Sequence, residues 1–175
     1  MLLPRRQLLK QLLFASTAVT LVPSCLLNNQ KSGVPLKHIT VNDTQEATFA
    51  SLLFAIIPDT DTPGSKALHL DLFAWKMLDD CTSKAEQDKF LKGLNEFAQF
   101  SQKITNNFFN KANPEQVDQV MQLLESKKDV SESLIMFYKM SKRLAIQAYT
   151  GSEFYMTNVR IYEQIPGRFH GCVKA

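Results

Sequence analysis

The residues closest to a chemical pattern are two acidic side chains in one short loop. Asp59 and Asp61 stand two apart in the sequence Pro-Asp-Thr-Asp-Thr-Pro-Gly at 58–64, a spacing that also opens calcium-binding loops. Gly64 stands at the position of the EF-hand glycine, but Leu70 stands where the distal glutamate of an EF-hand loop is needed. Because aspartate also accepts backbone hydrogen bonds in turns, the pattern favours turn capping over metal binding.

No other set of residues is typical of an enzyme site. The three histidines (His38, His69 and His170) are scattered, and the chain has neither a C-x-x-C pair nor a G-x-G-x-x-G loop. Metal ligands and dinucleotide-binding loops need such spacings. We therefore predict a non-catalytic chain that holds no catalytic, cofactor-binding or metal-binding residues of its own.

The charge of the chain is concentrated at its N-terminus. The net charge is +3, and Arg5, Arg6 and Lys10 account for it because no acidic residue precedes Cys25. The remainder of the chain is close to neutral. Nucleic-acid binding needs a surplus of Lys and Arg on one face, so the sequence predicts no nucleic-acid partner.

The N-terminal segment has the parts of an export signal. Arg5-Arg6-Gln7-Leu8-Leu9-Lys10 precedes an apolar stretch from Leu12 to Val22, which is diluted by one serine and two threonines. This stretch is shorter than the roughly 20 apolar residues that span a bilayer. We interpret residues 1–25 as a twin-arginine signal, which predicts passage through the twin-arginine translocase to the periplasm; an ordinary secretory signal is the alternative.

Cys25 ends this segment in the sequence Val-Pro-Ser-Cys. Lipid attached to Cys25 would hold the protein at the membrane, whereas cleavage near Ser24 without lipid is the alternative. Residues 26–41 are polar and weakly patterned, and we interpret them as a tether. Residues 42–175 then form one domain.

Two further cysteines, Cys81 and Cys172, remain for an oxidising compartment. They pair with each other, or one is buried while the other pairs with a second chain. Cys81 ends an apolar helix face, where a buried thiol is common, and Cys172 lies in a glycine-flanked tail.

The domain is predicted to be all-α, a bundle of about five helices. Capping boxes at Asn42–Gln45 and Ser83–Glu86, and the Asn113-Pro114-Glu115 start signal, open three of the helices. The others are expected over 68–80 and 131–149, with Gly151 ending the last. We expect apolar stripes to form the core, including Phe73, Trp75 and the methionines at 121, 136 and 140.

The segment after Gly151 differs from the bundle. Residues 152–162 have room for one short helix, and residues 164–172 contain two glycines and a proline. The Arg and Phe side chains there suggest an irregular tail that docks on a partner. A disordered C-terminus is the alternative.

Three patches in order resemble the gluconate 2-dehydrogenase subunit 3 family. They are Leu-Phe-Ala-Ile-Ile-Pro-Asp-Thr-Asp-Thr-Pro-Gly at 53–64, the Ser83–Leu94 stretch, and Gln-Ile-Pro-Gly-Arg-Phe-His-Gly-Cys at 164–172. Gly151 and the sequence His69-Leu70-Asp71 depart from the family pattern. The resemblance covers about residues 44–173.

The resemblance implies a non-catalytic small subunit of a membrane-associated dehydrogenase. Its large partner would be a glucose–methanol–choline type enzyme that binds FAD and oxidises a sugar or alcohol, with a cytochrome c subunit as a further partner. The small subunit would support maturation and export of the large one. A stand-alone helical lipoprotein that binds a small ligand or an envelope protein is the alternative.

Within that resemblance, the partner interface is expected at the loop and the tail. A proline and a glycine make a rigid loop that loses little order on docking, and Arg and Phe are enriched in binding hot spots. The expected interface residues are Asp61, Thr62, Pro63, Gly64, Pro166, Gly167, Arg168 and Phe169. Cys172 is the candidate for a disulfide bond between the subunits.

Overall fold

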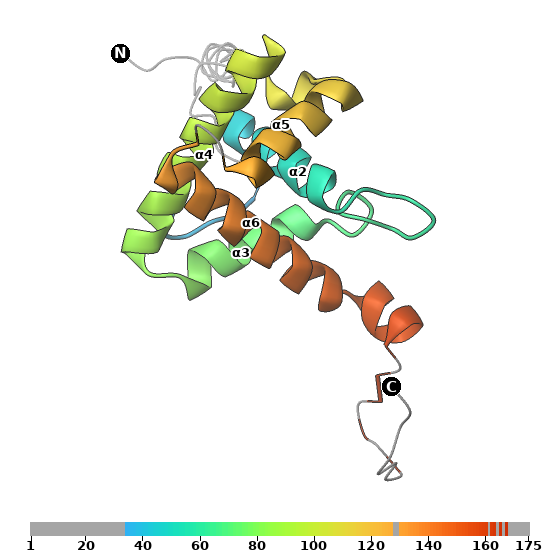
Figure 1. Cartoon of the computed structure of the whole chain (residues 1–175). Coiled ribbons are helices and arrows are strands. Elements are labelled where there is room, and N and C mark those ends of the chain that lie inside the picture. The colour runs from blue at the N-terminus through green and yellow to red at the C-terminus, as the bar shows by residue number, and fades with distance from the viewer. Residues whose placement is uncertain (1–33, 128–129, 161, 164, 166, 168–175) are drawn as a thin grey trace, which may run out of the picture. The chain divides into compact units, whose positions relative to one another are not determined.

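The computed structural model describes residues 34–127, 130–160, 162–163, 165 and 167. Within them, every regular element is a helix, which confirms the all-α prediction. Five α-helices follow one another: α2 (Asp43–Ile56), α3 (Leu70–Cys81), α4 (Lys84–Thr105), α5 (Pro114–Ser126) and α6 (Glu132–Thr150) (Figure 1). A 3₁₀ turn, η2 (Phe109–Lys111), precedes α5, and a π-helical turn, η3 (Tyr155–Val159), follows α6.

Three of these helices begin where the sequence predicts, two at predicted capping boxes and α5 at the predicted Asn113 start signal, which also proves to be a capping box. The side chains of Asn42, Ser83 and Asn113 accept from the backbone amide three residues later, and the side chain at that position accepts from the cap's own amide. This reciprocal pairing satisfies amides that have no partner inside the helix. In α5, Pro114 occupies the first turn, where its missing amide costs nothing.

The core lies where α2, α3, α4 and α6 meet. Its centre is an aromatic cluster in which Phe49 packs edge-on against Trp75 and Phe90 with ring centroids 4.8 and 5.3 Å apart. Phe137 of α6 joins it 4.9 Å from Phe90. At Gly93 a Cβ would lie 2.4 Å from Cβ of Phe137, so this glycine is what allows α4 and α6 to approach so closely.

Three details of the predicted core are wrong. Phe73 is 39% exposed and Met136 is 41% exposed, and Cys81 is an exposed free thiol instead of a buried one. On α3 the inward face is centred on Ala74, Trp75 and Leu78, so Phe73 lies at its margin. Met136 faces a surface hollow, and Cys81 is the last residue of its helix.

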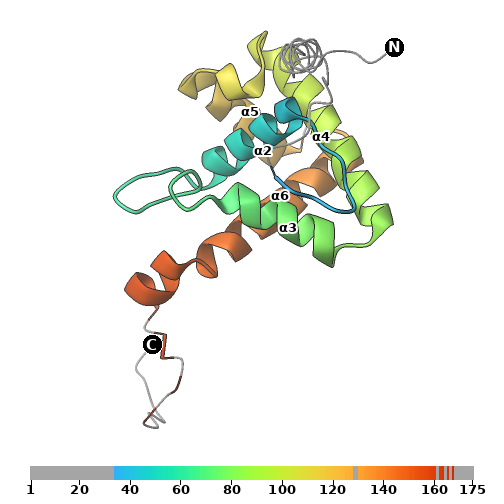
Figure 2. The same ribbon diagram turned by 180° about the vertical axis from the view of Figure 1, so that it is seen from behind.

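The interpretation of residues 26–41 as a tether is wrong for residues 34–41, which we call the strap. Val34, Ile39 and Val41 are only 8%, 5% and 2% exposed, and they belong to the same core as the helices. Figure 2 shows the strap lying along the helices before α2 begins. Burial of these apolar side chains makes the strap part of the folded domain.

No helix in the described part of the chain is long and apolar enough to cross a membrane.

Candidate functional site

The loop between α2 and α3 is closed at its neck by backbone contacts. The amide of Ser65 donates to the carbonyl of Ile57 at 2.9 Å, so the residues before and after the loop are joined. A Cβ at Gly64 would lie 2.4 Å from the carbonyl oxygen of Pro58. Only a residue without a side chain fits there, which is a steric reason for the glycine. We call residues 58–64 the docking loop.

Asp59 holds the docking loop from inside. Its Oδ1 accepts from the amide of Gly64 at 2.6 Å and from the amide of Ala67 at 3.5 Å. Turn capping by Asp59 is therefore confirmed. The described residues contain no group of three or more His, Cys, Asp or Glu side chains that could hold a metal ion.

The tip of the docking loop is presented to solvent. Asp61 and Thr62 are exposed, Pro63 is half-buried and Gly64 is buried. The amide of Thr60 donates to the carbonyl of Thr62 at 3.0 Å, which tightens the tip. The four predicted interface residues of the loop therefore divide into two that can touch a partner and two that shape the loop.

After the docking loop the chain makes a second tight turn into α3. The amide of Leu70 donates to the carbonyl of Ser65 at 3.1 Å. His69, the residue before α3, has a left-handed backbone with φ of 50°. Such a φ is uncommon outside glycine, although histidine is among the residues that adopt it more often than others.

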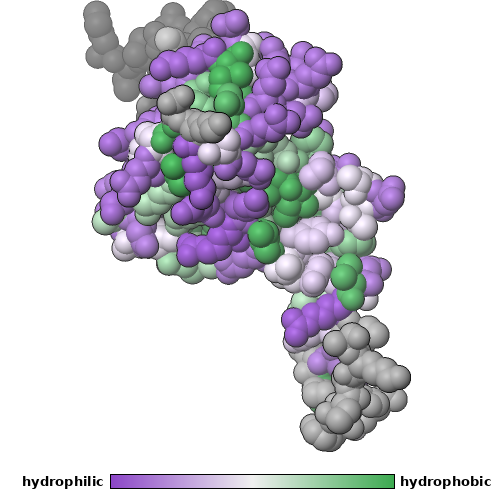
Figure 3. All heavy atoms as spheres, in the orientation of Figure 1, coloured by the Kyte–Doolittle hydropathy of each residue, from purple (hydrophilic) through white to green (hydrophobic). Residues whose placement is uncertain are grey.

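Two surface hollows flank this turn. One of about 450 Å³ lies against α2 and includes Ala50, Phe54 and His69. The other, of about 560 Å³, lies between the start of α3 and the end of α6, where Phe73 and Phe154 face it. Phe54 is 42% exposed, so the surroundings of the docking loop offer aromatic surface to a partner. On the face drawn in Figure 3, apolar patches likewise interrupt a mostly hydrophilic surface.

The C-terminal half of the predicted interface is only partly described. η3 follows α6 and lines the second hollow together with the turn before α3, so the chain leading to the tail starts beside the turn that follows the docking loop. Gly167 is exposed, and nothing lies within 4 Å of a Cβ built there. Pro166, Arg168, Phe169 and Cys172 lie outside the described residues, as do Arg5, Arg6 and Cys25.

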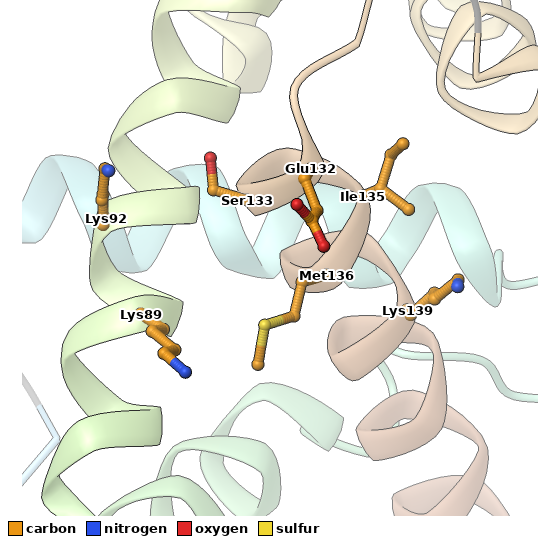
Figure 4. Close-up of a pocket in the computed structure, with 7 residues that line it drawn as sticks. All are labelled: Lys89, Lys92, Glu132, Ser133, Ile135, Met136 and Lys139. Carbon is orange, nitrogen blue, oxygen red and sulfur yellow. The ribbon is translucent and has the colours of Figure 1, made fainter.

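A third hollow, of about 600 Å³, lies between α4 and α6. Figure 4 shows Lys89 and Lys92 along α4, with Lys89 pointing toward Met136 of α6, whereas Lys139 of α6 points away from α4. Neither Lys89 nor Lys139 has an ion pair within 4.0 Å among the described residues. The three lysines and one glutamate that line it give the hollow a local positive charge on a neutral domain.

Sequence reasoning missed Asp79, a buried carboxylate on α3 that accepts three backbone hydrogen bonds. It is 2% exposed, and its carboxylate accepts from the amides of Lys37, His38 and Ile39 at 2.7, 2.8 and 3.0 Å. Burial raises the pKa of Asp79, and these three amides outweigh burial and lower it overall. The apolar residues Val34, Leu36, Ile39 and Val41 within a polar stretch were the signal that the strap is packed.

Comparison with known proteins places the chain. No curated protein and no solved structure matches it. A family model, by contrast, matches residues 43–167, which is more than half of the chain and includes the docking loop, the helices and the start of the tail. By this match the chain belongs to the gluconate 2-dehydrogenase subunit 3 family.

Proposed function

We propose that this protein is the non-catalytic small subunit of a periplasmic, FAD-dependent dehydrogenase of the glucose–methanol–choline type. It binds the large catalytic subunit, supports its maturation and carries it through the twin-arginine translocase by means of Arg5 and Arg6. The family to which the chain belongs is named for the third subunit of a dehydrogenase, which supports the role of an accessory chain.

The observation that carries the proposal is the construction of the docking loop. Its neck is closed by the Ile57–Ser65 hydrogen bond and by the close approach of Gly64 to Pro58. Asp61 and Thr62 are thereby held at an exposed tip. A surface loop that is already ordered loses little conformational entropy on binding, which favours a role in protein–protein recognition.

Two attachments complete the proposal. Cys25 carries lipid and keeps the complex at the membrane, and Cys172 forms a disulfide bond with the catalytic subunit. A cytochrome c subunit accepts the electrons from the FAD of the large subunit. A palmitate label lost in Cys25→Ser supports the first attachment, and a label that persists contradicts it. A non-reducing gel without a high-mass band contradicts the second.

Co-expression with the large subunit tests the central claim. With this chain present, the large subunit should bind FAD and reach the periplasm; without it, flavin-loaded periplasmic enzyme should be lost. If the large subunit folds, binds FAD and is exported alone, the proposal is wrong.

Thr62→Arg tests the docking loop itself. The substitution places a bulky charge at an exposed tip, so we expect weaker co-purification with the large subunit and an unchanged bundle. Gln119→Arg adds the same side chain to an exposed position on α5 and should leave co-purification unchanged. Equal binding by both variants would remove the docking loop from the interface.

A further inference from the structure

The strap is attached to α3 by side chains that neighbour one another on that helix. Asp79 accepts three successive strap amides, and Nζ of Lys76 donates to the carbonyl of Pro35 at 2.9 Å. The Lys37–Asp80 pair, 4.0 Å apart and largely exposed, adds little. Asp79 lies 40 to 42 residues from the amides it binds, so these hydrogen bonds join the strap to a distant part of the chain.

The start of the strap lies beside the first turn of α2. The amide of Val34 donates to Oε1 of Glu46 at 3.3 Å. The docking loop begins at the other end of the same helix, after Ile57. Eleven residues separate Glu46 from Ile57, which corresponds to about 16 Å of helix. Figure 2 shows the strap and the docking loop at opposite ends of α2.

The strap also sets how much chain is left between Cys25 and the folded domain. Residues 26–33 can extend to about 28 Å, whereas residues 26–41 would reach about 55 Å if the strap were free. Holding the strap therefore halves the reach of the domain from any anchor at Cys25.

We propose that Asp79 is a positioning residue that fixes the N-terminal end of α2 toward the membrane and directs the docking loop away from it. The inference rests on the membrane attachment at Cys25 in the proposed function. The surface around the strap then faces the lipid headgroups, and the catalytic subunit binds at the far end of α2. The membrane anchor and the partner are engaged at the same time without competing for one surface.

The first test uses Asp79→Asn, with Asp80→Asn as the matched control on the adjacent residue. Hydrogen exchange of the strap amides should become about tenfold faster in Asp79→Asn, while the amides of α4 and α6 stay protected. Asp80→Asn should exchange like the wild type. Unchanged strap exchange in Asp79→Asn would overturn the proposal, and so would an equal acceleration across the whole bundle. If Asp79→Asn does not fold, Lys37→Pro removes one donor from the strap side and carries the same expectation.

The second test measures orientation at a membrane with the full lipidated chain and no catalytic subunit. The chain is placed in vesicles of phosphatidylethanolamine and phosphatidylglycerol that contain an acceptor-labelled lipid, with a fluorescent amino acid at position 37 or 62. Energy transfer should be stronger from position 37 than from position 62, and Asp79→Asn should reduce that difference. Equal transfer from both positions, or a chain that does not remain on the vesicles, overturns the proposal. Because no large subunit is present, failure here is distinct from failure of partner binding.

Discussion

The docking loop and the strap are both irregular segments. Each is held by an aspartate whose carboxylate accepts hydrogen bonds from backbone amides. Asp59 is exposed and binds amides five and eight residues away. Asp79 is buried and binds three amides from 40 to 42 residues away. Asp59 closes its own loop, whereas Asp79 joins the strap to the helical bundle.

This difference in range decides what each aspartate controls. A local closure orders only its own loop, because the chain entropy that it removes is small and nearby. The hydrogen bonds of Asp79 join two segments that are far apart in the sequence. They can therefore form only when the strap is packed on the helices. In the proposed complex, Asp59 shapes a surface for a partner, while Asp79 holds the connection toward the leader.

Asp79→Ala should give the largest effect on stability. The substitution leaves three strap amides without their buried acceptor, and hydrogen bonds to a charged group contribute about 1.5–3 kcal/mol each. Since water can reach part of the freed strap, we expect a net loss of about 3 kcal/mol in the free energy of unfolding. Urea denaturation monitored by circular dichroism measures it.

Asp80→Ala is the control for that measurement. Its partner Lys37 is 4.0 Å away, and both side chains are well exposed, so the expected loss is below about 0.5 kcal/mol. Equal losses in the two variants would mean that the position on α3, and not the three amides, determines stability.

The helices were predictable from the sequence, and the strap was not. Asn42, Ser83 and Asn113 indicate helix starts in the sequence because a capping box involves only two residues that are three positions apart. Asp59 was assigned to turn capping for the same local reason. Nothing within a few residues of Asp79 indicates that its carboxylate accepts from the amides of residues 37–39, since those residues lie 40 to 42 positions away in the sequence. The exposure of Phe73 and Met136 was missed because helical periodicity identifies the apolar face of a helix. It does not show how much of that face the neighbouring helices cover.

Gly64→Ala should have the next largest effect. The new Cβ would meet the carbonyl oxygen of Pro58 at 2.4 Å and the amide of Asp59 at 2.7 Å, and these backbone atoms can yield only if the neck opens. We expect a loss of about 1–3 kcal/mol, together with weaker binding of the large subunit. Gly167→Ala, with nothing within 4 Å, should leave stability unchanged. A fully stable Gly64→Ala domain would show that the neck is not rigid.

Strong acid should loosen the strap. The lowered pKa of Asp79 means that its stabilising contribution is complete above the unfolded value of about 3.9. That contribution is lost as the pH falls through the folded pKa, which lies lower. Hydrogen exchange of residues 37–39 should rise over that range by less than in Asp79→Ala, because a protonated carboxyl still accepts. In Asp79→Asn this pH dependence should disappear, and its persistence would assign the transition to another group.

Asp59→Ala should give the smallest change in stability. It removes the 2.6 Å bond to the amide of Gly64, but that amide gains access to water, so the expected loss is about 0.5–1 kcal/mol. The Ile57–Ser65 bond remains to close the neck. Exchange at Gly64 should accelerate while the strap amides stay protected, and binding of the large subunit should weaken more than stability does. Asp118→Ala, on the exposed face of α5, is the control. If Asp59→Ala instead also accelerates exchange of the strap amides, the docking loop and the strap open as one cooperative unit. The roles of Asp59 and Asp79 would then not be separate in this domain.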